Sequence, residues 1–240
     1  MNILLFGASG MVGQGVLREC LRADDVERVV VIGRTSITQH HQRLGPRLRE
    51  ILLPDCVDYG PVEEELKGFD ACFFCLGVSS SGMTEAEYTR VTYDLTLTAA
   101  SALARLNPGM VFVYISGAGT DSSESGPSMW ARVKGRTENA LKRLPFKGVS
   151  LLRPGVILPM HGERSKVSAY RLFYRLAGPV LNAFNRLVPG RFLTTEIMGR
   201  AMLELARQGG LRPILPILEV ADILRVAGKD KKPTAQAPAL

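Results

Sequence analysis

The chain has 240 residues, which is enough for one α/β domain with a full hydrophobic core. Hydrophobic residues make up 46% of it and charged residues 22%, a globular composition that argues against a disordered chain. The net charge of +7 is scattered, without a basic run interleaved with aromatic residues, so we expect no nucleic-acid partner. No apolar stretch approaches the ~20 residues that span a bilayer, and the apolar run before Gly7 is too short for a signal peptide. We therefore expect a cytoplasmic protein without a membrane span.

A strand, a glycine turn and a helix follow one another at the start of the chain. The apolar run 2–6 leads into the sequence GASGMVG at 7–13, and residues 12–22 read as a helix. Backbone N–H groups and the helix dipole at such a helix start favour a pyrophosphate. Glycines at 7, 10 and 13 let the turn tighten, let phosphates approach and let the helix lie close to the strand. The sequence therefore predicts a dinucleotide site, against the alternative of a merely structural turn.

Apolar segments and helical patterns alternate along most of the remaining chain. This alternation predicts an α/β fold with a doubly wound parallel sheet, the Rossmann fold, and right-handed crossovers. Ligands of such a sheet bind at the carboxyl ends of its strands, where Gly7, Arg34, Gly77, Ser116 and Pro154 fall. Strands are predicted at 28–33, about 49–53, 70–76, 110–116 and 148–153, and helices at 85–105 and 128–144.

One NAD(P)-binding domain is expected over residues 1–227, with a disordered tail at 228–240. Within it, segment 160–195 is expected to form a small helical cap over the nicotinamide end of the site. Its apolar stripe is compatible with packing against the sheet, an apolar substrate pocket, a homodimer surface or a membrane-surface helix. The stripe consists of Tyr170, Phe173, Ala177, Val180, Phe184 and Leu187.

Cys72 and Cys75 form a CxxC pattern that could indicate a redox or metal site. The pattern lies in a predicted strand, where positions i and i+3 point to opposite faces, so the two thiols cannot converge. No second Cys/His pair has metal-ligand spacing, and we expect no metal site.

The end of the second predicted strand indicates which dinucleotide binds. An NAD site has an acidic residue about 20 residues beyond the glycines, which accepts a hydrogen bond from the ribose 2′-OH. Here that position is occupied by Gly33 and Arg34, and a guanidinium can grip a 2′-phosphate bidentately. Ser9 could add a hydroxyl contact, whereas the alternative is that Arg34 is only a solvated loop cation. The sequence favours NADP(H).

The motifs, taken in order, resemble the atypical short-chain dehydrogenase/reductases. They are the glycine turn, the sequences GRT at 33–35 and CLG at 75–77, Ser116, VKG at 133–135 and LRPGV at 152–156. The branch that includes the HIV Tat-interacting protein is most similar, with bacterial relatives labelled NAD-dependent epimerase/dehydratase. The resemblance implies cofactor contacts from Gly7, Ser9, Gly10, Met11, Val12, Gly13, Arg34, Leu76, Gly77, Lys134, Pro154 and Val156.

The same resemblance implies a catalytic Ser116, which would hydrogen-bond a substrate carbonyl, and a Lys134 that holds the nicotinamide ribose. The family's general acid/base is a tyrosine four residues before that lysine, but here Trp130 stands in its place. An indole N–H has no proton that titrates near neutral pH. Tyr88, Tyr93 and Ser128 are candidate substitutes, and each is also explained as a packing or helix-start residue.

Two classes of function follow from this sequence. The first is an NADP(H)-dependent oxidoreductase acting on a small apolar carbonyl or alcohol, with an unconventional proton donor. The second is a non-catalytic NADPH-binding sensor that acts through a regulatory protein partner, and a weaker third is a nucleotide-sugar epimerase/dehydratase. If Trp130 faces the nicotinamide, hydride transfer should be slow, and Trp130→Tyr should restore it.

Overall fold

The fold is a parallel seven-stranded sheet with helices on both faces. The computed structural model describes residues 1–37, 45–163, 192–209 and 217–228. The strand order is β3-β2-β1-β4-β5-β6-β9, and every neighbouring pair is parallel, which confirms the predicted doubly wound Rossmann fold. The strands are β1 Asn2–Phe6, β2 Arg28–Gly33, β3 Leu48–Leu52, β4 Ala71–Phe74, β5 Val111–Ile115, β6 Gly148–Leu152 and β9 Ile217–Leu218.

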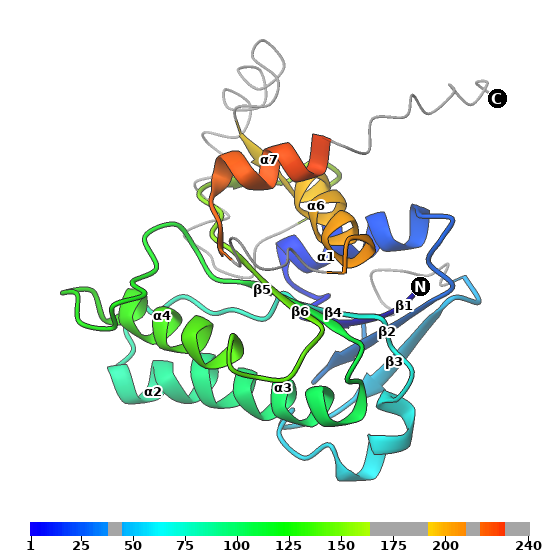
Figure 1. Ribbon diagram of the computed structural model, residues 1–240, viewed down its shortest axis with the longest axis horizontal. Helices are drawn as coiled ribbons and strands as arrows, with labels where there is room; N and C mark the ends of the chain where they lie inside the picture. The colour runs from blue at the N-terminus through cyan, green and yellow to red at the C-terminus, as the bar shows by residue number, and fades with distance from the viewer. Residues whose placement is uncertain (38–44, 164–191, 210–216, 229–240) are drawn as a thin grey trace.

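Two groups of helices cover the two faces of the sheet (Figure 1). One face carries α1 Met11–Arg22, α6 Thr195–Arg207 and α7 Val220–Gly228, while the other carries α2 Glu85–Thr89, α3 Leu95–Leu106 and α4 Met129–Leu141. A 3-10 helix spans Gly60–Leu66, and a separate two-stranded sheet joins β7 Ile157–Leu158 to β8 Leu193–Thr194.

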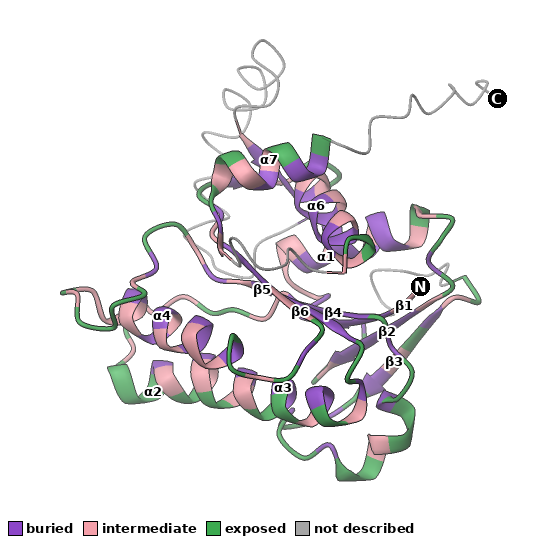
Figure 2. Cartoon of the chain, viewed as in Figure 1, coloured by how far each residue is buried: buried purple, intermediate pink, exposed green. Residues whose placement is uncertain are grey.

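The strand side chains alternate between two hydrophobic cores. Ile3 and Leu5 of β1 pack in the core under α1, α6 and α7, whereas Leu4 and Phe6 pack in the core under α3. Both faces of the strands β1, β2, β4 and β5 are buried (Figure 2), and this accounts for their nearly unbroken hydrophobicity. In the second core, aromatic rings stack across neighbouring strands, Phe6 on Phe74 at 5.0 Å and Phe74 on Phe112 at 5.8 Å between ring centroids.

The strand predicted at the CxxC pattern is confirmed as the buried strand β4 for Cys72, whereas Cys75 directly follows the strand, and the two thiols lie on opposite faces of the sheet. Cys72 belongs to the core under α3, while Cys75 packs against the core under α1. Burial raises the pKa of both thiols, which makes them poor nucleophiles and metal ligands. The described residues contain no group of three or more His, Cys, Asp or Glu that could hold a metal ion.

Three parts of the chain differ from the sequence-based prediction. The helix predicted at 85–105 is interrupted by one π-helical segment, Arg90–Asp94, between α2 and α3. Helices α6 and α7 were not predicted, and the strands β7, β8 and β9 that precede them have only two residues each, too few for a visible alternation.

Among the described helices, none is long and apolar enough to cross a membrane.

Close contact between α1 and α6 explains two glycines outside the turn. A Cβ on Gly15 would lie 2.5 Å from the Cβ of Thr195, and one on Gly199 would lie 2.6 Å from the Cγ of Glu19. The side chain of Thr194 accepts a hydrogen bond from the N–H of Ile197 and so caps the start of α6. Most of the expected cap, residues 164–191, and the expected tail beyond Gly228 lie outside the described residues.

Candidate functional site

The predicted site residues follow the carboxyl ends of neighbouring strands. Hydrogen bonds continue the register past those ends: Cys75 N–H donates to Phe6 O at 3.0 Å, and Ser116 N–H donates to Leu152 O at 2.8 Å. Ala118 N–H then reaches Pro154 O at 2.8 Å. The segments after β1, β4, β5 and β6 therefore meet at one edge of the sheet, as the topology requires.

The glycine turn after β1 is built by close backbone contacts. Gly7 has φ +80°, and a Cβ on it would lie 2.6 Å from the carbonyl carbon of Cys75. A Cβ on Gly13 would lie 2.1 Å from the carbonyl oxygen of Gly7. The Gly10 N–H closes the turn by donating to the same oxygen at 2.9 Å. Side chains at positions 7 and 13 would fill this turn, so its shape depends on glycine.

The first turn of α1 presents backbone donors at this edge. Gly10 is the N-cap, no side chain among the described residues caps it, and the first turn has no acidic residue. Gln14 Nε2 instead donates to Ser9 O at 3.2 Å, within the glycine turn. An open N-terminal turn beside a glycine cradle fits a pyrophosphate, because the N–H groups and the helix dipole both favour an anion. The residues present therefore fit a dinucleotide.

Arg34 lies at the end of β2, next to the strand that leads into the glycine turn. Its side chain is exposed and makes no hydrogen bond or ion pair with another residue of the described ranges. Leu53 N–H donates to Gly33 O at 3.0 Å, which fixes the backbone immediately before Arg34. The position that would carry an acidic residue in an NAD site thus carries an exposed guanidinium.

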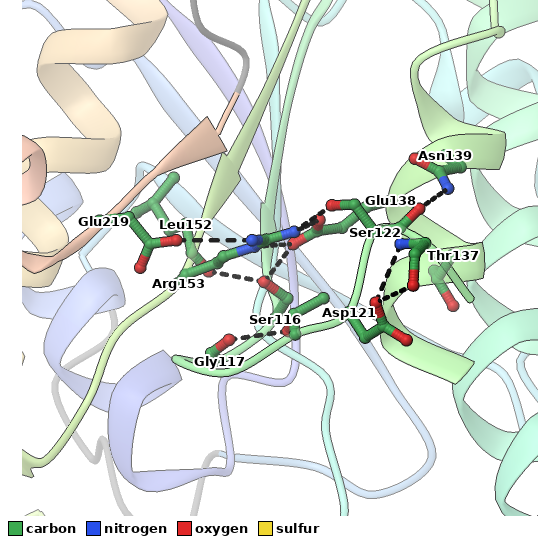
Figure 3. Close-up of polar contacts among 12 residues, drawn as sticks. Ser116, Gly117, Asp121, Ser122, Thr137, Glu138, Asn139, Leu152, Arg153 and Glu219 are labelled. Atoms are coloured by element: carbon green, nitrogen blue, oxygen red, sulfur yellow. Dashed lines mark hydrogen bonds and ion pairs between the residues drawn. The ribbon is translucent and has the colours of Figure 1, made fainter. Parts of the chain in front are cut away.

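Ser116 is engaged by a buried carboxylate (Figure 3). Its Oγ lies 2.6 Å from Glu138 Oε1 and 3.1 Å from Leu152 O, and both of these atoms are acceptors. A hydroxyl has a single hydrogen, and the charged oxygen at the shorter distance is the stronger acceptor. The hydroxyl hydrogen of Ser116 is therefore donated to Glu138.

Glu138 is fully buried and is neutralised by Arg153 (Figure 3). The guanidinium donates from Nε to Oε1 at 3.1 Å and from Nη2 to Oε2 at 2.5 Å, a bidentate pair that raises the pKa of Arg153. Nη2 also donates to Ser122 Oγ at 2.6 Å, and Nη1 lies 3.4 Å from Glu219 Oε1. This ion pair ties α4 to the end of β6 directly behind Ser116.

Lys134 lies one helical turn before Glu138 on α4. Its Nζ donates to the backbone oxygen of Ser116 at 2.9 Å and lies 5.7 Å from the centroid of the Tyr114 ring. Burial lowers the pKa of Lys134 to about 8, although the negative charge of Glu138 acts in the opposite direction. The amine is therefore held at the end of β5 with a pKa close to neutral pH.

Trp130 packs on the glycine-containing loop that follows Ser116. A Cβ on Gly119 would lie 3.5 Å from Trp130 Cη2, and one on Gly117 would lie 3.9 Å from Cζ3. The backbone at Asp121 crosses α4 closely, because a Cβ on Gly135 would lie 1.7 Å from Asp121 O. The indole is thus positioned beside the end of β5, one turn before Lys134.

The three candidate substitutes for the missing tyrosine have structural partners or positions. Tyr88 is 2% exposed, and burial raises its pKa. Tyr93 lies under the Arg136 guanidinium at 4.8 Å from ring centroid to Cζ. Ser128 is the N-cap residue of α4, although its side chain makes no capping hydrogen bond. Each position agrees with the packing or helix-start explanation.

Apolar side chains are exposed beside this edge. Val78 follows β4 and is 48% exposed, Val156 follows β6 and is 50% exposed, and Met160 is 42% exposed. Small-molecule sites are lined mainly by apolar side chains, and the exposure of these groups agrees with ligand-facing positions.

Sequence reasoning missed the role of Glu138 and the position of Arg153 beside it. Glu138 stands four residues after Lys134, so both lie on one face of the helix, and this spacing was a usable signal. The ion pair of Glu138 with Arg153 had no such signal in the sequence, because it joins α4 to the end of β6, which come together only in the folded chain.

This strand order, the glycine turn against a helix N-terminus and a lysine beside the end of β5 define an NAD(P)-binding Rossmann protein of the short-chain dehydrogenase/reductase type. Residues 3–127 match the family model described as the NAD dependent epimerase/dehydratase family. The chain belongs to this family, whose members bind a nicotinamide dinucleotide, and its relatives place it in an atypical branch.

Named relatives of this chain come from a mammal and from fungi. The protein HTATIP2 of Rattus norvegicus is 30% identical over 158 residues, which are 65% of this chain and 63% of that protein. FMP52 of Eremothecium gossypii is 31% identical over 166 residues, 68% of each chain. Fmp52 of Emericella nidulans is 28% identical over 203 residues, 83% of this chain and 84% of that protein.

Solved structures support the fold. A short chain dehydrogenase/reductase from Saccharomyces cerevisiae superposes with a TM-score of 0.65 at 13% identity, covering 92% of this chain and 96% of that one. The UDP-glucuronic acid 4-epimerase from Bacillus cereus, solved in complex with NAD, gives 0.66 at 16% identity over 95% and 84% of the two chains.

The expectation of a cytoplasmic protein is wrong. The FMP52 relatives, which match as much as 95% of this chain, are named as mitochondrial proteins.

Proposed function

We propose that this chain is an NADP(H)-binding oxidoreductase that acts on a small, apolar carbonyl or alcohol. The observation that carries the proposal is that the glycine turn and Lys134, whose pKa of about 8 is close to neutral pH, both lie at one edge of the sheet. The cradle suits a dinucleotide pyrophosphate, and Lys134 lies where the resemblance expects the nicotinamide ribose. When bound in its reduced form, the nicotinamide supplies a hydride to a carbonyl carbon.

The preference for NADP(H) rests on Arg34. An acidic residue at this position would accept from a ribose 2′-OH and repel a 2′-phosphate, whereas a guanidinium can bind the phosphate bidentately. Arg34 is exposed at the end of β2 without a partner in the described part of the chain, so it is available for such a contact.

The apolar substrate is supported by the side chains exposed beside the site. Val78 and Val156 leave apolar surface open after the ends of β4 and β6, and Met160 is exposed after β7. A ligand with little polar surface gains affinity by covering them, at ~25 cal/mol for each Å² removed from water.

A second candidate is a non-catalytic NADPH-binding sensor that acts through a protein partner. It is favoured by one observation: Trp130, which offers no titratable proton, occupies the position of the family's tyrosine. A nucleotide-sugar epimerase/dehydratase remains the weaker third candidate, since it also needs the missing tyrosine.

Two measurements on the purified chain separate these candidates. Fluorescence titration should give NADPH and NADP⁺ an affinity at least about tenfold higher than NADH and NAD⁺. A panel of small apolar aldehydes and ketones should then oxidise the bound NADPH. Tight NADPH binding with no oxidation across the panel would favour the sensor, and equal affinity for both reduced cofactors would contradict the assignment of NADP(H).

A further inference from the structure

The site has no tyrosine at the position of the family's general acid, so another group must protonate the substrate. We propose that Lys134, and not Ser116, donates to the substrate carbonyl oxygen and supplies its proton. The proposal rests on the proposed function, because it concerns the proton that accompanies hydride transfer.

Ser116 has no hydrogen to give. Its one hydroxyl hydrogen is taken by Glu138 Oε1 at 2.6 Å, and the other polar atom in range, Leu152 O, is also an acceptor. Glu138 is itself fixed by the bidentate contact with Arg153, so it cannot turn away cheaply. Ser116 Oγ can only accept from a ligand, and a carbonyl oxygen placed against it would face another acceptor.

The aromatic side chains near Ser116 also lack an accessible proton. Trp130 packs its indole on the Gly117 and Gly119 loop and has only an N–H that does not titrate near neutral pH. Tyr88 and Tyr114 are 2% and 1% exposed, and burial raises the pKa of both phenols. These phenols are closed off from a ligand at the edge of the sheet.

Lys134 has what the other groups lack. Its Nζ is anchored at 2.9 Å to the backbone oxygen of Ser116, and an ammonium has three N–H donors, so this bond leaves others for a ligand. This hydrogen bond holds the amine at the end of β5, beside the Ser116 hydroxyl, which can only accept a hydrogen bond from a ligand. An oxygen ligand at this position would thus meet Lys134 as its donor.

Burial of the Lys134 amine lowers its pKa and so favours proton release near neutral pH, against the opposing charge of Glu138. Glu138 on α4 stabilises the ammonium, but Arg153 from the end of β6 neutralises much of that carboxylate. On β5, the Tyr114 ring faces the amine, and its buried phenol carries no charge. The resulting pKa of about 8 lies close to the working pH that general acid catalysis favours.

The proton balance of the step is simple. The carbonyl carbon receives a hydride, which is two electrons and a proton, from the reduced nicotinamide, and the nicotinamide is oxidised in the same step. The carbonyl oxygen takes one proton from Lys134 Nζ, so the product is an alcohol and the lysine becomes a neutral amine. Water returns the proton to Nζ, and the reverse reaction uses the neutral amine as the base.

The decisive variant is Lys134→Arg, which keeps a cation and N–H donors but has a side chain that does not lose a proton. At pH 7, NADPH affinity should stay within about threefold, while single-turnover NADPH oxidation should fall by ~10²-fold or more. Lys142→Arg, at the exposed end of the same helix, is the matched control and should change neither value. Ser116→Ala and Trp130→Phe should each lose clearly less of the rate than Lys134→Arg, because neither side chain supplies the proton.

A second readout needs no turnover. The rate at which the Lys134 amine is acylated in the cofactor-free protein, followed by mass spectrometry across pH, should show a midpoint near pH 8, well below the ordinary lysine value of about 10.4. Acylation of Lys142 is measured in the same samples as the control. A midpoint for Lys134 equal to that of Lys142 would contradict the proposal.

Three kinetic results would also overturn it. They are an unchanged single-turnover rate in Lys134→Arg, a loss in Ser116→Ala as large as that expected for Lys134→Arg, and a ~10²-fold gain in Trp130→Tyr, which would mean that no group supplied the proton before. If the unmodified chain binds NADPH but reduces no carbonyl, the proposed function fails and this proposal fails with it. If the unmodified chain turns over and Lys134→Arg does so equally, only the assignment of the proton fails.

Discussion

The two halves of the site are constructed differently. The glycine turn between β1 and α1 is made of backbone, and its geometry depends on the absence of side chains at Gly7 and Gly13. The region after β5 is made of side chains, where Ser116, Lys134 and Glu138 are placed by hydrogen bonds between separate elements. The first half can be recognised from a short stretch of sequence, whereas the second depends on which residues the fold brings together.

This difference separates binding from chemistry. A backbone cradle holds a dinucleotide whatever stands at position 130, while the fate of the transferred proton depends on a few side chains. The chain has the glycine spacing of the cradle, and it carries Trp130 where the resemblance implies a tyrosine. Changes in the two halves should therefore have separable effects on affinity and turnover.

The largest effect is expected from Gly13→Ala in the cradle. The added Cβ would lie 2.1 Å from the carbonyl oxygen of Gly7, so the turn and α1 must move apart. Because the clash is with backbone, we expect destabilisation at the upper end of the ~1–3 kcal/mol typical of overpacking, with loss of detectable NADPH binding. Thermal unfolding and fluorescence titration measure the two effects.

Gly109→Ala is the control for this variant. Gly109 is exposed, and nothing lies within 4 Å of the position of its added Cβ, so stability and NADPH affinity should stay unchanged. Normal NADPH binding by Gly13→Ala would show that the cradle is not the dinucleotide site.

The next effect is expected from Glu138→Gln in the side-chain half. The amide keeps the shape but removes the charge that neutralises Arg153 in a buried site, so we expect a loss of about 3 kcal/mol of unfolding free energy. For a chain of this size that corresponds to a melting temperature lower by about 6–12 °C. NADPH affinity should change little, since the cradle is intact.

Glu64→Gln provides the comparison for a surface charge. Glu64 pairs with Lys67 and its side chain is 84% exposed, so the variant should lose at most about 1 kcal/mol. Equal stability losses in the two variants would show that Glu138 does not hold the second half together.

A smaller effect is expected from Arg34→Ala, which tests the cofactor preference. Loss of a charge-assisted bidentate contact costs ~1.5–3 kcal/mol, so NADPH binding should weaken about tenfold or more. NADH has no 2′-phosphate and should bind as before. Arg49 lies on β3, and its exposed side chain pairs with Glu65. The variant Arg49→Ala should leave both affinities unchanged. An equal weakening of NADH would contradict the contact.

The smallest effect concerns the pH dependence of stability. The folded pKa of Lys134 is about 8, and the unfolded value is near 10.4, so the unfolded chain binds more protons between these values. Stability should therefore rise with pH across this window, and Lys134→Met should remove that part of the rise. Lys142→Met should keep it, and identical pH slopes of the melting temperature in both variants would contradict the shift.

The sequence predicts the first half of the molecule better than the second. Strands covered on both faces are continuous apolar runs, and the spacing of Gly7, Gly10 and Gly13 is a local signal, so the sheet and the cradle could be predicted. Helices α6 and α7 follow two-residue strands, and α6 packs against α1 while α7 packs against α6, which no local pattern reports. The Glu138–Arg153 pair spans α4 and β6, so only the folded chain shows that Ser116 has its hydrogen engaged.

The pH profile of single-turnover NADPH oxidation tests the central claim most directly. With saturating NADPH and an apolar aldehyde in excess, the rate should be constant below about pH 8, where Lys134 is protonated, and should fall about tenfold for each further pH unit. A rate that stays flat to pH 10 would contradict the account, because an uncharged amine is too weak an acid to protonate the substrate oxygen.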